Sequence, residues 1–435
     1  MDSRMANTST ANFVDRLLMK LDEAIVPIWI RFFFIIDQPI DEKILLLTFQ
    51  QLIRETPRLR SLWNNTNQSW DEQPYELTQL RIGVNYDSQV VGAATRIHSL
   101  LTNTQKGDED LPIKVNFGAV DLGAFLLSFE LHHGASDGRS FLNIVKRFWE
   151  IFENVIKDRP LLPSKLNHTT LNDGLVIKQL LRNPGQILKL GKSANRQLAR
   201  RADPLKHQAT RIGLPNLMSF KIHKQHLIKH KPAALFYAAV VAAIIQLEDI
   251  DANKTIRLRL PVDIRAECKL SSESIGNACS ALMIELDLKE MRSLFADNPY
   301  ALVSEMESKL KQQLKNKLHI ANAFECLLVS KLSTKASLHK AAPKELLGTK
   351  RSCSLVITFM GEVDPFITPP KPFELKTAWS HTPVWGINAY LYKDNLHINL
   401  CCFDGIWSRA TQTQFCQYLA NFLTELPTTI GLENV

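Results

Sequence analysis

The chain has 435 residues, of which 45% are hydrophobic, as is usual for a folded protein with more than one domain-sized unit. Its net charge of +8, from 52 Lys and Arg against 44 Asp and Glu residues, is spread too thinly to indicate nucleic-acid binding and suits a polyanionic small molecule or an acidic protein equally. Its seven cysteines show no CxxC spacing, so we expect reduced thiols rather than a disulfide framework or a zinc ribbon.

Neither secretion nor a membrane-spanning segment is expected from the sequence. Asp15, Arg16 and Lys20 interrupt the region in which a signal peptide needs an apolar stretch. The longest apolar run, residues 234–245, is shorter than the roughly 20 residues that a membrane span requires. This run therefore predicts a buried helix.

The first predicted elements are a strand, a helix and a β-hairpin. Aromatic and β-branched residues in IWIRFFFII, residues 28–36, predict the strand. Asp41 can cap the helix that follows, and Pro57 ends it. The segments IKVNFGAV (113–120) and AFLLSFELHH (124–133) flank a DLG turn and predict the hairpin.

The hairpin ends in two histidines that we expect to point in opposite directions. Because strand side chains alternate, Leu131 shares one face with His133, whereas Glu130 shares the other with His132. Beyond them, residues 141–155 carry apolar side chains at helical spacing, which predicts a helix packed on the sheet.

The middle of the chain is basic and predicts a connector between two halves. A solvated helix joining two domains is one interpretation, and contact with a membrane surface, an acidic carrier protein or a phosphate-bearing ligand is the alternative. Against the single acid Asp203, this region carries the cations Lys189, Lys192, Arg196, Arg200 and Arg201.

The second half repeats the mixture of strands and helices, so we predict an α/β chain with two units of similar size. The predicted units are residues 1–175 and 216–435, joined by the connector 176–215. In the second unit we expect strands at 256–265, 281–288, 354–361 and 396–403, a basic helix near 309–317 and a final helix at 411–423.

The stretch LHHGASDGRSF, residues 131–141, is the main candidate for chemistry. A metal site is disfavoured because neighbouring strand residues diverge and no third ligand lies at a useful spacing. A hydrogen-bonded structural pair of histidines remains an alternative. The pattern favours a catalytic base, because His133 ends an apolar face where Gly134 and Gly138 let the backbone turn and Asp137 can fix the local geometry. An imidazole can also accept and return a proton near neutral pH.

HHGASDG resembles the HHxxxDG motif of the CoA-dependent acyltransferase superfamily. That superfamily includes chloramphenicol acetyltransferase, plant and fungal acyltransferases, wax ester synthases, alcohol acetyltransferases and the condensation domains of nonribosomal peptide synthetases. RETPRLRSLW (54–63) resembles its HP.LR element with Thr56 in place of the histidine, and RLPVDIR (259–265) its PVSLR strand. Ile275-Gly276-Asn277 resembles the glycine-asparagine element, and LRNPGQILKL the crossover of the wax ester synthase group.

The resemblance implies two chloramphenicol-acetyltransferase-like subdomains, each a mixed sheet flanked by helices, with the active site in a tunnel between them. The motif residues His132, His133, Asp137 and Gly138 would form the catalytic set, with Arg265 and Asn277 in support. His133 would act as the general base without an acyl-enzyme. Asp137 would pair with Arg265 to hold the turn, and Asn277 would either steady the oxyanion or serve as a turn residue.

Three functions follow as hypotheses. The first is an acyltransferase that moves an acyl group from acyl-CoA to a hydroxyl acceptor. The second is a free-standing condensation-type enzyme that takes its donor from a phosphopantetheinyl carrier protein and forms an amide or an ester. The third is a non-catalytic relative that only binds. We expect a cytoplasmic monomer without a permanent cofactor, metal or nucleic-acid partner, and with possible peripheral membrane contact or an acidic acyl carrier protein as partner.

Overall fold

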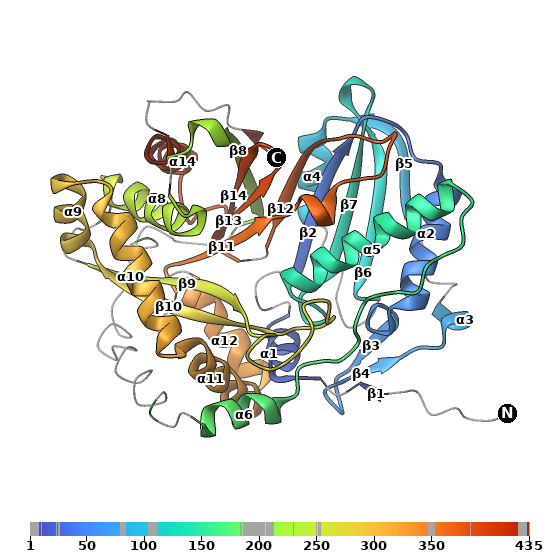
Figure 1. Ribbon diagram of the computed structural model, residues 1–435, viewed down its shortest axis with the longest axis horizontal. Helices are drawn as coiled ribbons and strands as arrows, with labels where there is room; N and C mark the ends of the chain where they lie inside the picture. Colours follow the sequence, from blue (N-terminus) through green and yellow to red (C-terminus); the bar gives the residue numbers. More distant parts are fainter. Residues whose placement is uncertain are drawn as a thin grey trace.

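The protein is described by a computed structural model in which two large sheets, each covered by helices, make up most of the molecule (Figure 1). The residues described are 8–9, 11–22, 24, 27–78, 84–102, 111–182, 185, 205, 213–228, 230–248, 250, 254–346, 353–382, 384–424 and 433–434.

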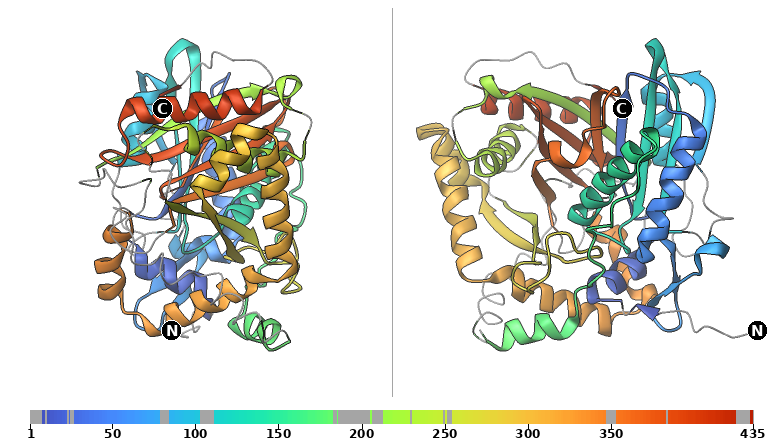
Figure 2. Two further views of the ribbon diagram at one scale, coloured as in Figure 1. Left: turned by 90° about the vertical axis from the view of Figure 1, so that its left-hand side faces the viewer. Right: turned by 45° about the vertical axis from the view of Figure 1, so that its right-hand side comes forward.

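The first sheet has the strand order β12-β2-β7-β6-β5 and contains the predicted strand and hairpin. Its helices α2 and α5 lie side by side on one face (Figures 1 and 2). Asp41 caps α2 as predicted, through the backbone N–H groups of Lys43 and Ile44. The bounds are β2 Trp29–Ile36, β5 Val84–Val91, β6 Ile113–Val120, β7 Ala124–His132, β12 Leu375–His381, α2 Glu42–Glu55, α4 Ala93–Thr102 and α5 Gly138–Ile156.

The core of this half lies between the sheet and those two helices. Every second residue of β2 and β7 points into it, and Phe129 of β7 meets Phe148 of α5 edge to face with ring centroids 4.8 Å apart. Leu52 of α2 is fully buried against the same cluster. Burial of these large side chains fixes the register of β7, and with it the point at which the strand ends.

Strand β12 comes from the second half of the chain but pairs antiparallel with β2 of the first sheet, with Trp379 opposite Phe33 (Figure 1). A segment late in the chain thus belongs to the sheet of the first half. The predicted boundary at residues 176–215 stays a prediction, since most of that connector lies outside the described residues. No local pattern in the sequence indicated that β12 would join the first sheet.

The second sheet has the strand order β10-β9-β11-β13-β14-β8-β15. The predicted apolar helix is α8, whose side chains from Ala234 to Ile245 are buried against the sheet and α14. The bounds are β8 Pro215–His223, β9 Thr255–Asp263, β10 Cys279–Asp287, β11 Leu355–Glu362, β13 Gly386–Tyr392, β14 Asn395–Phe403, β15 Glu433–Asn434, α8 Pro232–Gln246 and α14 Arg409–Leu423.

The remaining elements lie around these two sheets, and α1 packs against α11 and α12 at the lower side of the view in Figure 1. The bounds are α1 Phe13–Leu21, α3 Tyr75–Thr78, α6 Asp173–Leu181, α9 Leu288–Asp297, α10 Ala301–Lys315, α11 Leu318–Leu332, α12 Lys335–Leu346, α13 Asp364–Ile367, β1 Thr8–Ser9, β3 Ser61–Asn64 and β4 Ser69–Glu72.

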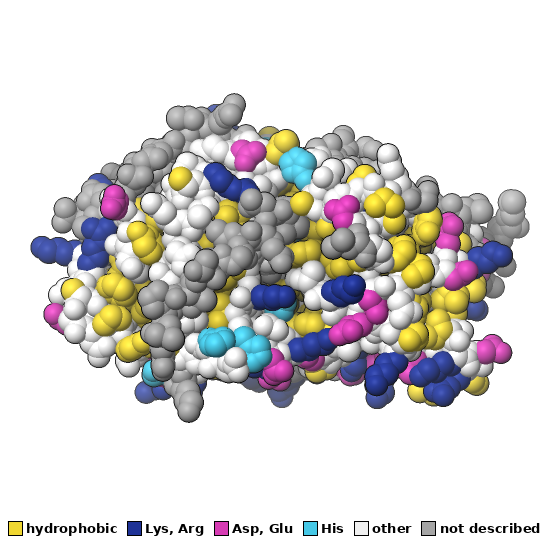
Figure 3. Space-filling model, turned by 90° about the horizontal axis from the view of Figure 1, so that it is seen from above, with side chains coloured by type: hydrophobic (Ala, Val, Ile, Leu, Met, Phe, Trp, Pro, Cys, Tyr) yellow, Lys and Arg dark blue, Asp and Glu magenta, His cyan; other side chains and the backbone are white. Residues whose placement is uncertain are grey.

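Charged and apolar side chains are mixed on one face of the molecule. On the face shown in Figure 3, Lys and Arg side chains are interspersed with acidic and apolar ones. Within the described part of the chain, no helix is both long enough and apolar enough to cross a bilayer. The cations predicted for the connector, Lys189 to Arg201, lie outside the described residues.

Candidate active site

The HHGASDG segment forms the corner between β7 and α5. Strand β7 ends at His132, the chain turns from His133, and Asp137 becomes the N-cap of α5 by accepting a hydrogen bond from the Ser140 N–H at 2.9 Å. The His133 N–H donates to the carbonyl of Ile28 at 2.8 Å, which ties the start of the turn to β2. The corner is therefore anchored at both ends.

His133 is held in one tautomer. Its Nδ1 lies 3.0 Å from the carbonyl oxygen of Ser136, and a carbonyl can only accept, so Nδ1 carries the proton. The neutral ring then has its lone pair on Nε2, for which the described residues supply no hydrogen-bond partner. Burial lowers the pKa of His133 below its ordinary value, although the Ser136 carbonyl and the Asp137 charge act in the other direction. A partly exposed, neutral imidazole with a free Nε2 is suited to accept a proton.

His132 has the opposite tautomer. Its Nδ1 accepts a hydrogen bond from the Gly134 N–H at 3.1 Å, so the proton lies on Nε2, 3.1 Å from Asp22 Oδ1. The same carboxylate oxygen accepts the N–H of Ile28 at 3.0 Å. The ring is fully buried and packs edge-on against Trp29. His132 therefore supports the turn from within the protein, where it is shielded from solvent.

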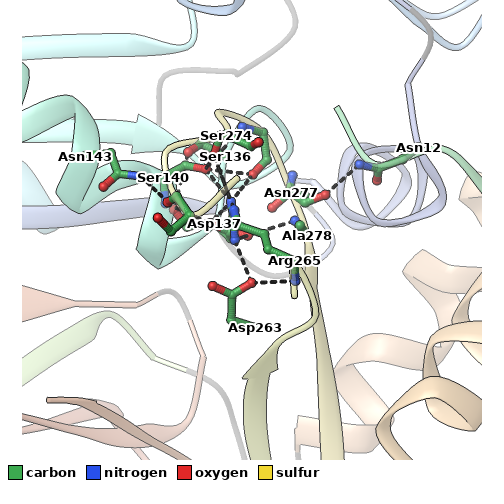
Figure 4. A network of polar contacts seen from close by, with 12 residues as sticks. Asn12, Ser136, Asp137, Ser140, Asn143, Asp263, Arg265, Ser274, Asn277 and Ala278 are labelled. Atoms are coloured by element: carbon green, nitrogen blue, oxygen red, sulfur yellow. Dashed lines mark hydrogen bonds and ion pairs between the residues drawn. The ribbon is translucent and has the colours of Figure 1, made fainter. Parts of the chain in front are cut away.

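Asp137 and Arg265 form a bidentate ion pair, which is the pairing that the resemblance implied. Nη1 and Nη2 of Arg265 each donate to one carboxylate oxygen of Asp137 at 3.0 Å (Figure 4). Burial alone would raise the pKa of Asp137, but the Arg265 guanidinium, with backbone donors from Ser140 and Ala278, outweighs it and lowers that pKa. The carboxylate thus faces Arg265 and remains ionised.

Arg265 joins the turn to the loop before β10. Besides Asp137 it donates to the exposed carboxylate of Asp263 at 3.0 Å and to Ser140 Oγ at 2.6 Å. It also reaches the carbonyls of Ser274 and Gly276, at 3.2 and 3.0 Å from Nη2. Burial would lower the pKa of Arg265, but the two carboxylates raise it, so the residue stays charged.

Asn277 points at the start of the turn formed by residues 133–137. Its side-chain Nδ2 lies 2.8 Å from the His133 carbonyl oxygen, 3.0 Å from that of Gly134 and 2.8 Å from Asp15 Oδ1. These contacts use both N–H groups of the amide, so they favour a role for Asn277 in holding the turn. The alternative role, as a hydrogen-bond donor to the oxyanion, remains a prediction. The next residue, Ala278, donates its backbone N–H to Asp137 at 2.8 Å.

A second set of polar residues beside the turn was not found from the sequence. Asn12 caps α1 and donates its side-chain amide to the Asn277 carbonyl at 2.7 Å (Figure 4). Asp15 of α1 is completely buried and pairs with Arg58 at 3.2 Å. Arg58 belongs to the 54–63 segment whose resemblance was noted, and the N-cap spacing of Asn12 and Asp15 was the other available signal.

The two glycines of the motif have different surroundings. A Cβ on Gly134 would collide with Met19 of α1 and lie 3.0 Å from His132 Nδ1. A Cβ on Gly138, the exposed first residue of α5, would have no neighbouring atom within 4 Å. A side chain at position 134 would thus force Met19 to shift, whereas one at position 138 would meet open space.

Among the described residues, no three His, Cys, Asp or Glu side chains are grouped so that they could hold a metal ion. The seven cysteines are free thiols. Burial raises the pKa of Cys279, the cysteine nearest in sequence to Asn277, so that it does not carry a reactive thiolate at neutral pH.

Comparison with solved structures identifies the fold. Trichothecene 15-O-acetyltransferase from Fusarium sporotrichioides matches with a TM-score of 0.72 and 12% identity, covering 97% of this chain and 98% of that one. The first condensation domain of the calcium-dependent antibiotic synthetase, solved with a substrate analogue, matches with a TM-score of 0.67 and 13% identity over 99% and 100% of the two chains. The starter condensation domain of rhizomide synthetase, solved with C8-CoA, matches at 0.61 and 14% identity over 97% and 96%.

These likenesses establish that the chain has the fold shared by CoA-dependent acyltransferases and condensation domains, as predicted from HHGASDG. No protein-family model matches the chain, and a search of curated proteins found no match. At 12 to 14% identity, the fold is what the comparison supplies, and the chemistry has to be argued from the site.

Proposed function

We propose that this protein transfers an acyl group from a thioester donor to a hydroxyl acceptor, with His133 as the general base. The observation that carries the proposal is the tautomer of His133. Because Nδ1 donates to the Ser136 carbonyl, Nε2 is left as a proton acceptor on a partly exposed ring. Burial lowers the pKa of this ring, which keeps it neutral and ready to accept a proton at pH 7.

The reaction proceeds by direct transfer. Nε2 of His133 takes the proton of the acceptor hydroxyl while the hydroxyl oxygen attacks the thioester carbonyl carbon and a C–O bond forms. The tetrahedral intermediate then expels the thiolate by breaking the C–S bond, and the imidazolium returns its proton to the sulfur. The products are an ester and a free thiol, and no acyl-enzyme is formed.

Asp137 has a positioning role in this mechanism. Its carboxylate is bound by Arg265 and by the Ser140 and Ala278 N–H groups, and the Nδ1 of His133 is bound by the Ser136 carbonyl. The carboxylate therefore does not orient the imidazole directly, as the aspartate of a Ser-His-Asp triad does. It keeps α5 and the turn in register instead.

The donor remains the open part of the proposal. An acyl-CoA donor is supported by the likeness to a starter condensation domain solved with C8-CoA, whereas the net charge of +8 suits the phosphates of CoA and an acidic carrier protein equally. A carrier-protein donor is the second candidate, supported by the likeness to a condensation domain of an antibiotic synthetase. A relative that only binds its ligand is the third, and the free Nε2 of His133 argues against it.

Thiol release separates these candidates. The purified protein is mixed with acyl-CoA donors from acetyl to palmitoyl, and with the same acyl groups on a phosphopantetheinyl carrier protein, each with alcohols or amines as acceptors. Acceptor-dependent release from CoA supports the first candidate, and release from the carrier alone supports the second. Release from neither donor class, with donor binding retained, would contradict the proposed transfer.

A further inference from the structure

The side-chain amide of Asn277 has only one workable orientation. Nδ2 contacts three oxygens: the carbonyls of His133 and Gly134 and the carboxylate of Asp15. If the amide were flipped, its Oδ1 would face three acceptors without a proton between them. Both N–H groups therefore donate hydrogen bonds, to the carbonyls at the start of the turn and to Asp15 of α1.

The carboxylate of Asp15 fixes this amide from the other side. Its Oδ1 accepts from Asn277, while its Oδ2 accepts from Nη2 of Arg58 at 3.2 Å and from the Asn12 N–H at 3.3 Å. Asp15 is fully buried and Arg58 is 5% exposed. Removing two charges from water costs at least as much free energy as their attraction in the protein interior returns. Replacing such a pair with apolar side chains is therefore often neutral for stability. A role in placing neighbouring groups accounts for its presence.

Two supports of the turn meet at consecutive residues. The Asn277 side chain holds the carbonyls of His133 and Gly134 at the start of the turn, whereas the Ala278 N–H holds the Asp137 carboxylate at its end. The Arg265 pair belongs only to the second support. The first support thus connects α1 and the Asn277 loop to the backbone of His133 without passing through Asp137.

We propose that Asn277, held by Asp15, is a positioning residue that sets the place of the His133 imidazole through the carbonyls of His133 and Gly134. This inference rests on the proposed function of His133. Asn277 touches no reacting atom in this account. Asn277 affects the rate indirectly, because displacing the general base by about 1 Å can lower turnover on the order of 100-fold.

The central experiment compares Asn277→Ala with Asn143→Ala. Asn143 is a matched control, because its side-chain amide also crosses between the halves, to the Ser272 carbonyl at 2.8 Å, but does not touch the catalytic turn. We expect Asn277→Ala to lower kcat by roughly 10- to 100-fold with KM within about 2-fold, and Asn143→Ala to leave both nearly unchanged. Equal effects of the two variants would reduce Asn277 to a general structural contact and overturn the proposal.

A swap variant tests the route of the effect with the side-chain volume and total charge retained. Its kcat is compared after thermal unfolding has shown a native fold, because Asp15→Asn also removes the charged partner of buried Arg58. In Asp15→Asn with Asn277→Asp, the two side chains can still bond to each other, but the carboxylate at 277 cannot donate to the carbonyls of His133 and Gly134. We expect kcat to stay low in this double variant. Wild-type kcat in the swap would show that only the link between residues 15 and 277 matters, which contradicts the proposal.

Ring titration separates this inference from the proposed function. The imidazole of His133 is followed by NMR in the wild type, Asn277→Ala and Asn143→Ala. A looser turn admits water, so we expect the His133 pKa to move up towards its ordinary value in Asn277→Ala alone. Failure of the proposed function would appear as thiol release that does not depend on His133. If the His133 titration and kcat were both unchanged in Asn277→Ala, the positioning role of Asn277 would be contradicted, whereas the proposed function of His133 would still stand.

Discussion

The guanidinium of Arg265 binds both carboxylate oxygens of Asp137 at 3.0 Å, across 128 positions of sequence. Both side chains are less than 5% exposed, so neither charge has water as an alternative partner. This pair fixes the N-cap of α5 to the loop before β10, and the turn that carries His133 lies between β7 and that cap.

The two carboxylates on Arg265 should differ in their effect on stability. We expect Asp137→Asn to lower the free energy of unfolding by about 3–5 kcal/mol, because it leaves a buried guanidinium without its bidentate partner. Asp263 contacts the same Arg265 but its side chain is 44% exposed, so Asp263→Asn should cost about 1 kcal/mol or less. Denaturant unfolding of the two variants measures both. Similar losses would argue against the central place of the buried pair.

The pH dependence of stability has a definite sign for Asp137. Its pKa is lower in the folded protein than in the unfolded chain, so its contribution is present above the ordinary carboxyl pKa and is lost as the pH falls through the folded value. We expect the stability difference between wild type and Asp137→Asn to shrink below about pH 4. Unfolding curves at pH 7, 5 and 3 test this, and a constant difference would contradict it.

The adjacent histidines should separate stability from activity. His132→Ala removes a buried ring that accepts a hydrogen bond from the Gly134 N–H and whose Nε2 lies 3.1 Å from Asp22 Oδ1, so it should lower the free energy of unfolding by about 1–3 kcal/mol. His133→Ala should leave the melting temperature close to that of the wild type. Thermal unfolding of the two variants measures this difference. A larger loss of stability in His133→Ala than in His132→Ala would indicate that the His133 ring has a structural role.

Activity should rise with pH as His133 loses its proton. Because burial lowers the pKa of His133, we expect the acid limb of kcat/KM to fall below the ordinary histidine value of about 6.5. Two neighbouring side chains also act on this pKa through their charges: Asp137 raises it and His132 lowers it. The profile is measured between pH 4.5 and 8.5 with a saturable acceptor, and an acid limb above 7 would point to a different base.

The motif glycines should respond differently to an added methyl group. Gly134→Ala collides with Met19 and should cost about 1–3 kcal/mol of stability. Gly138→Ala meets no protein atom, so its stability should be unchanged or higher by up to about 1 kcal/mol. Denaturant unfolding of the two variants measures this difference, and an equal loss of stability in both would contradict it.

Strong local signals predicted much of the fold. The alternating residues of β6 and β7, the cap and apolar face of α2 and the apolar run of α8 each lie where the sequence placed them. Strand β12 was missed because its position depends on pairing with β2, some 340 residues earlier, and no property of LKTAWSH specifies that partner.

Only part of the site was predicted, because its remaining contacts also depend on residues far apart in the sequence. The sequence carries the HHGASDG corner, and resemblance pointed to the Arg265 partner of Asp137. The contacts of Asn277 to the His133 backbone and to Asp15 depend on where α1 packs, which follows from tertiary contacts. The different tautomers of His132 and His133 likewise depend on a backbone N–H in one case and a carbonyl in the other.

The role of His133 as the general base can be measured by acceptor-dependent thiol release from wild type and His133→Ala, with the fold of both checked by thermal unfolding. With the best acyl donor and alcohol, we predict that the wild type releases one thiol per ester formed and that His133→Ala, at native stability, loses that activity by at least about 100-fold. Release of thiol at the wild-type rate by folded His133→Ala would contradict the role of His133 as the general base.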